Sequence, residues 1–157
     1  MEAGFTQLGR RLSAQEKREY GRRLELTLLV INESGRMFRM GAFAHGARMA
    51  RSLGPAVEIL FVDLDAAHSR TDILLSEFPG LRVIMPTGKM TFAGAVALGM
   101  REALAPLVLV LDSSTAIVDL DLKAARAAFA ANRRLFAIGP GLVDEDGTVL
   151  PACLRGR

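Results

Sequence analysis

The sequence predicts an α/β fold, a Rossmann-like and mostly parallel sheet with flanking helices. Short runs rich in Val, Leu and Ile alternate along the chain with longer segments of helical periodicity, which is the order of successive βαβ units. The 157 residues suit one domain rather than two, and 50% of them are apolar, which is enough for a buried core. No internal repeat or low-complexity linker interrupts the alternation.

The apolar runs predict the strands. Val, Leu and Ile dominate each run, as is typical of strands that are buried on both faces of a sheet. The predicted strands are residues 26–31, 58–62, 81–85, 107–111 and 135–138. Because helical segments separate them, we expect parallel neighbours joined by right-handed crossovers.

Helical periodicity lies between the predicted strands. The predicted helices are residues 38–53, 71–77, 91–103 and 120–132. In the first, Phe43, Ala47 and Ala50 share one face. In the third, the residues at i, i+3, i+4 and i+7 that share a face are Phe92, Ala95, Val96 and Gly99.

Residues 1–23 are polar and are read as an N-terminal arm or short helix that precedes a domain of residues 24–157. Ser13 is a candidate N-cap, and Glu16 would close a capping box. The arm is interpreted as a solvated helix that leads into the domain. The alternative is that its basic residues bind anionic lipid or a partner, but salt screens the attraction of so few charges.

Composition excludes several classes of function. Two histidines and one cysteine are too few for a typical zinc site, and with no Trp and one Tyr there is little surface for stacking bases. The net charge of +3 gives no reason to expect a nucleic-acid partner. No run approaches the roughly 20 apolar residues of a membrane span, and residues 1–23 lack the apolar stretch of a signal peptide. We therefore expect no transmembrane segment and a cytoplasmic location.

Polar residues follow four of the predicted strands, where ligands bind in sheets of this kind. Two of these strands end in an aspartate, Asp63 and Asp112, and a carboxylate there can hold a ribose hydroxyl, a base N–H or a hydrated cation. Capping the next helix or turning the chain explains an aspartate at these places equally well. The segments are Asn32-Glu33-Ser34-Gly35, Asp63-Leu64-Asp65, Pro86-Thr87-Gly88-Lys89 and Asp112-Ser113-Ser114-Thr115.

Three segments in order carry a family resemblance: AVEILFVDLDAAHSRTD, LRVIMPTGKMTFAGAVALGM and APLVLVLDSSTAIVD. They resemble the nucleotide-sugar-binding half of family 2 glycosyltransferases, whose fold is called GT-A. That half has a strand ending in Asp, a Gly/Ala-rich helix and a strand ending in Asp-x-Asp. The later run FAIGPGLVDEDGTVLP looks like the family's fifth strand and a hairpin that turns at Asp146-Gly147. The resemblance covers about residues 24–150.

The resemblance implies a domain that binds a nucleoside-diphosphate sugar. Asp63 or Asp65 would face the base or ribose, and Asp112 would lie beside the ribose and the metal-bridged diphosphate. A divalent cation, Mg²⁺ or Mn²⁺, would stabilise the charge of the diphosphate leaving group. Ser114 stands where the family has the second Asp of Asp-x-Asp, and its hydroxyl can ligate magnesium but brings no charge. We therefore expect weakened metal binding.

Other departures from the family concern catalysis. In the family, the acceptor site and the catalytic base lie in a second half that follows Asp-x-Asp, and PACLRGR at the end of this chain does not provide it. No residue here is assigned a catalytic role, and we expect the chain alone not to transfer sugar. Either the chain is a piece of a longer transferase, or it is a small relative that kept the scaffold and lost the chemistry.

The alternative function is that of a non-catalytic scaffold or interaction domain that associates with itself. A mean hydropathy of +0.26 is high for a monomeric soluble domain. A missing half would also uncover apolar surface, and a homo-oligomer is a simple way to cover it. A receiver-like fold is the rival architecture, but the acidic pair that it needs after its first strand is absent, since Asn32-Glu33 stands there.

Overall fold

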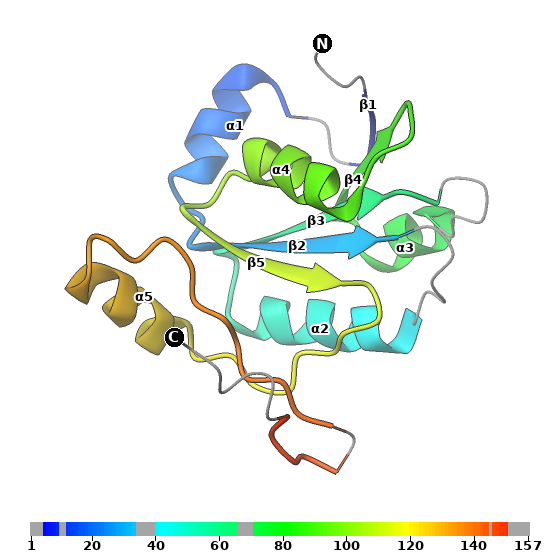
Figure 1. Cartoon of the computed structure of the whole chain (residues 1–157). Helices are drawn as coiled ribbons and strands as arrows, with labels where there is room; N and C mark the ends of the chain where they lie inside the picture. Colours follow the sequence, from blue (N-terminus) through cyan, green and yellow to red (C-terminus); the bar gives the residue numbers. More distant parts are fainter. Residues whose placement is uncertain (1–4, 10–11, 34–39, 66–70, 145, 151–157) are drawn as a thin grey trace. The chain divides into compact units, whose positions relative to one another are not determined.

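Five strands and five helices make up the described part of the chain, which a computed structural model gives as residues 5–9, 12–33, 40–65, 71–144 and 146–150 (Figure 1). The chain divides into two units, residues 1–118 and 119–157, which are described separately. In chain order the elements are β1 (Phe5–Gly9), α1 (Ala14–Gly21), β2 (Leu26–Asn32), α2 (Met40–Ser52), β3 (Val57–Asp63), α3 (Thr71–Glu77), β4 (Arg82–Pro86), α4 (Phe92–Glu102), β5 (Leu107–Asp112) and α5 (Leu122–Ala131).

The strands of the first unit form one sheet in the order β1-β4-β3-β2-β5. Strands β2, β3, β4 and β5 are parallel, and β1 is antiparallel to β4. Helices separate the parallel strands along the chain, and α2 and α4 lie on opposite sides of the sheet (Figure 1). The predicted α/β fold with a mostly parallel, Rossmann-like sheet is confirmed.

Burial on both faces explains why the predicted strands are uniformly apolar. All seven residues of β2 are buried, as expected for a central strand between two layers of helices. Alternate residues belong to one core cluster, in which Leu29, Ile31, Leu60, Val62 and Ile84 pack with Ala95 and Leu98 of α4. On the opposite face, Ala47 of α2 is fully buried.

The predicted apolar face of α4 is confirmed. Ala95 and Gly99 are buried, and Phe92 and Val96 are partly buried against the core cluster. Thr91 caps the helix, since its side chain accepts a hydrogen bond from the backbone N–H of Gly94. For α2 the prediction is confirmed at Ala47 only, because the side chains of Phe43 and Ala50 lie outside the described part of the structure.

The N-terminal arm contains one predicted element and one that was not predicted. Ser13 and Glu16 form the expected capping box at the start of α1. Strand β1, with the sequence FTQLG, was not predicted, because it has neither the apolar run of a buried strand nor a regular alternation. Its pairing with β4, with Thr6 opposite Met85, places it at the edge of the sheet.

In the second unit, the prediction of a strand at residues 135–138 is wrong. These residues are in no strand, and Phe136 is 95% exposed. Helix α5 matches the prediction and is capped by Asp121. An antiparallel bridge joins Val143 to Val149 around the expected turn. An apolar run becomes a strand only where a neighbour pairs with it, and no described residue of 119–150 is buried.

No helix within the described ranges is long and apolar enough to cross a membrane.

Candidate functional site

The carboxyl ends of β3, β2 and β5 lie side by side at one edge of the sheet. Asn32 is opposite Asp63 on β3, and Ile31 is opposite Asp112 on β5. From β2 the chain proceeds to β3 and then β4 on one side, and it then crosses back to β5 on the other side of β2. The strand order therefore reverses between β2 and β5. In open α/β sheets, this switch point is where ligands bind.

A chain of buried side chains runs along this edge. Thr71 Oγ1, at the start of α3, donates to Asp63 Oδ2 at 3.2 Å. Asn32 Nδ2 donates to Asp63 Oδ1 at 2.9 Å, and Ser113 Oγ donates to Asn32 Oδ1 at 3.1 Å. All four side chains belong to buried residues. The chain thus ties α3, β3, β2 and the end of β5 together.

Asp65 and Asp63 are coupled through the backbone. The N–H of Asp65 donates to Asp63 Oδ1 at 3.0 Å, which folds the chain back just after β3. Asp63 is 1% exposed, whereas Asp65 is partly exposed. Of the two carboxylates proposed for the base or ribose, Asp65 is the more accessible.

Asp112 and Ser114 form a second pair at the end of β5. Asp112 Oδ1 accepts a hydrogen bond from the backbone N–H of Ser114 at 2.7 Å and a second one from the Ser114 hydroxyl. Asp112 is partly exposed and Ser114 is exposed. The two residues predicted to lie beside the diphosphate are therefore in contact with each other and open to solvent.

The structure does not bring Asp63 and Asp112 together. Val108 and Val110 of β5 pack on the α4 side of the sheet, so the alternation of side chains places Asp112 on that side too. Val62 also packs on the α4 side, which places Asp63 on the opposite side. With β2 between their strands, the backbones are also about two strand spacings, or roughly 10 Å, apart. One small ion cannot bridge both carboxylates.

The described residues supply part of the ligand shell of a cation and not a complete shell. Among them, no three His, Cys, Asp or Glu side chains are grouped as a metal site would require. Asp112 is the single partly exposed carboxylate at the end of β5. Mg²⁺ is often held by one or two carboxylates together with substrate phosphates, so Asp112 fits such an ion only when a diphosphate completes its shell.

Asn32 and Ser113 belong to the predicted strand-end segments but were given no role in the site, and Thr71 was not predicted as part of it. The sequence shows polar residues after the strands, but it does not show which of them meet. That depends on the register of β2 against β3 and β5, which places Asn32 between Asp63 and Ser113. An Asn and an Asp that end neighbouring strands are a signal for such a pair.

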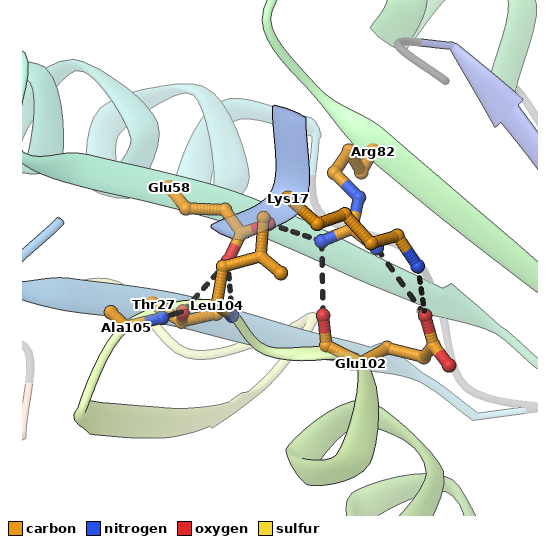
Figure 2. Close-up of polar contacts among 7 residues, drawn as sticks. All are labelled: Lys17, Thr27, Glu58, Arg82, Glu102, Leu104 and Ala105. Carbon is orange, nitrogen blue, oxygen red and sulfur yellow. Dashed lines mark hydrogen bonds and ion pairs between the residues drawn. The ribbon is translucent and has the colours of Figure 1, made fainter. Parts of the chain in front are cut away.

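A second polar cluster lies at the opposite end of the strands and was not predicted (Figure 2). Arg82 of β4 pairs with Glu58 of β3, and each side chain is 1% exposed. Glu58 Oε2 also accepts from Thr27 Oγ1 at 2.8 Å and from the N–H of Leu104 at 3.0 Å. A charged residue inside an apolar strand signals such a pair, because an unpaired buried charge is very costly.

Glu102 extends this cluster to the surface. Arg82 donates to the backbone oxygen of Glu102 at 3.0 Å, and its second nitrogen lies 3.5 Å from the Glu102 carboxylate. Lys17 of α1 lies 3.2 Å from the same carboxylate (Figure 2). Anionic and cationic side chains thus alternate from the core to α1, in the order Glu58, Arg82, Glu102 and Lys17. This arrangement holds elements together and leaves the buried charges no contact with solvent.

A surface hollow of about 530 Å³ also lies at the amino end of β3. Arg51 on its rim stacks over the ring of Phe78, 5.1 Å from its centre. The hollow is away from Asp63, which ends the same strand. It is lined by Tyr20, Arg51, Gly54, Pro55, Val57, Ile59 and Gly80.

No protein-family model, curated protein or solved structure matches this chain. The resemblance to family 2 glycosyltransferases therefore rests on the motifs of the sequence alone.

Proposed function

We propose that residues 1–118 bind a nucleoside diphosphate, carried as a nucleotide sugar, at the carboxyl ends of β2, β3 and β5. The observation that carries the proposal is the switch point between β2 and β5, with polar side chains at the ends of three adjacent strands. The motif order of the sequence supports the same ligand class.

The ligand lies against the partly exposed carboxylates of this edge. Asp65 accepts hydrogen bonds from the base or ribose, for which a carboxylate after a strand is suited. Asp112 and Ser114 lie beside the diphosphate, and Asp112 would hold a divalent cation, which would offset the repulsion between the carboxylate and the diphosphate. These assignments give binding without transfer, since no described residue is assigned to activate an acceptor.

A thermal-shift panel tests the proposal. UDP, GDP, dTDP and CDP are each added at millimolar concentration, with and without Mn²⁺. A ligand that binds only the folded state raises the melting temperature by mass action. We expect one base to give a shift that grows with Mn²⁺, and Asp112→Asn to abolish the Mn²⁺ dependence. Glu77→Gln, the same carboxylate-to-amide change at the exposed last residue of α3, is the control. No shift with any nucleotide would refute the proposal.

Self-association is the second candidate, and the edge of the sheet favours it. Strand β5 ends the described sheet, and its residues Leu107–Asp112 are all partly exposed, although five of the six are Leu or Val. Apolar edge strands invite pairing with another chain. Sedimentation across the micromolar range tests this candidate. We expect a dimer that dissociates on dilution, and a single monomeric species at all concentrations would contradict it.

A further inference from the structure

We propose that Asp63 is a positioning residue, which sets the conformation of the segments that carry Asp65 and Ser114 and does not itself touch the ligand. This inference rests on the proposed function for its ligand, but it concerns a different role for Asp63 than the sequence predicts.

Both oxygens of Asp63 are occupied by donors from three parts of the chain. Oδ1 accepts from Asn32 Nδ2 at 2.9 Å and from the N–H of Asp65 at 3.0 Å. Oδ2 accepts from Thr71 Oγ1 at 3.2 Å. Asp63 is 1% exposed, so a ligand could reach either oxygen only by displacing one of these donors. Leaving such a donor or acceptor unpaired in the interior is unfavourable.

The same bonds fix the groups that do face the ligand. The bond from its own N–H holds Asp65 in a turn at the end of β3. On the other side, Asp63 fixes the amide orientation of Asn32, whose Oδ1 then accepts from Ser113 Oγ at 3.1 Å. Ser113 is adjacent to both Asp112 and Ser114. A change at Asp63 therefore reaches Asp65 through one hydrogen bond, and Asp112 through two hydrogen bonds and the backbone of Ser113.

Thr71 allows the role of Asp63 to be tested without altering its carboxylate. Thr71→Val is nearly isosteric and removes the donor to Asp63 Oδ2, whereas Thr71→Ser retains a hydroxyl. If Asp63 binds the ligand directly, Thr71→Val frees an oxygen and nucleotide affinity stays equal or rises. If Asp63 is a positioning residue, affinity falls, roughly tenfold for one buried hydrogen bond.

The chain supplies a matched control in Thr27. Thr27 is also fully buried, and it also donates to a buried carboxylate, Glu58 Oε2, at 2.8 Å. This pair lies at the other end of the same strands. Thr27→Val removes a comparable bond and also the acceptor of the Ala105 N–H, which lies 3.2 Å from Thr27 Oγ1. It therefore lowers the melting temperature without changing the predicted site. The experiment compares Thr71→Val, Thr71→Ser and Thr27→Val, each assayed with the nucleotide that gives the largest shift with the unaltered chain.

Amide signals in ¹H–¹⁵N spectra provide the readout that separates the two proposals. We expect Thr71→Val, but not Thr27→Val, to shift the backbone signals of Asp65 and Ser114, and Thr71→Ser to restore both the signals and the affinity. Unmoved signals, or a loss of affinity equal in both valine variants, would overturn the positioning role. If the unaltered chain binds no nucleotide, the proposed function fails, and the spectra alone still decide whether Asp63 positions the two segments.

Discussion

At the scale of single residues, Glu58 and Arg82 show how this sheet accommodates charge. Removing an ion from water costs several kcal/mol, and mutual attraction offsets that cost only when the remaining hydrogen-bonding groups are satisfied. Here Thr27 and the N–H of Leu104 complete the Glu58 carboxylate. Among the buried side-chain nitrogen and oxygen atoms of the described residues, Arg82 Nε alone has no hydrogen-bond partner. The pair is thus well but not fully compensated.

Arg82→Met is predicted to lower the free energy of unfolding by about 3–5 kcal/mol, because it leaves the Glu58 carboxylate buried without a cation. The double variant Glu58→Gln with Arg82→Met should recover part of that loss, since no buried charge remains and the amide oxygen can still accept from Thr27 and from the N–H of Leu104. Lys17→Met is the control, because it breaks the more exposed pair with Glu102 and should cost less than about 1 kcal/mol. Urea unfolding measures all three. A double variant as unstable as Arg82→Met would contradict this account.

At the scale of elements, close packing between α4 and β2 depends on a single glycine. A Cβ on Gly99 would lie 2.4 Å and 2.6 Å from the two methyl carbons of Leu29, which is fully buried in the core. Gly99 costs roughly 1 kcal/mol of helix propensity relative to alanine, but it lets α4 approach the sheet closely.

Gly99→Ala is predicted to destabilise the protein by about 1–3 kcal/mol, since the gain in helix propensity is outweighed by overpacking against Leu29. Gly41→Ala in α2 is the matched substitution, because no atom of the described residues lies within 4 Å of its added Cβ. It should be neutral or stabilising by up to about 1 kcal/mol. Thermal unfolding of both variants checks the prediction. If Gly99→Ala were as stable as Gly41→Ala, the packing of α4 would not be limited at this position.

Elements of strong periodicity could be predicted from the sequence, and elements that depend on distant pairing could not. The helix at Thr71–Glu77 follows from its local sequence pattern. The four parallel strands also follow from local pattern, because burial on both faces of a sheet requires an apolar run. Strand β1 exists because β4 offers it an edge, which no local pattern reveals. The run 135–138 has the composition of a strand but no pairing partner in the described structure.

At the scale of the whole molecule, a parallel sheet predicts that the segments after its strands share one edge, but not which of their side chains meet. Because β2, β3 and β5 are parallel, their carboxyl ends lie at one edge of the sheet. Whether Asp63 and Asp112 share a face depends on one-residue differences in where each strand ends. Because side chains alternate along a strand, such a difference moves a carboxylate to the other side of the sheet.

The two units are predicted to differ sharply in hydrogen exchange. In residues 119–150 no described residue is buried, whereas all seven residues of β2 are. Local opening is easy where few apolar contacts are lost, so amides of 119–150 should exchange within seconds to minutes and those of β2 should exchange slowest. Exchange measured by mass spectrometry on the full chain, at two protein concentrations, tests this. Protection of 119–150 equal to that of β2 would contradict the prediction. Protection that appears only at the higher concentration would instead show that a second copy covers this unit, and would favour self-association as the function.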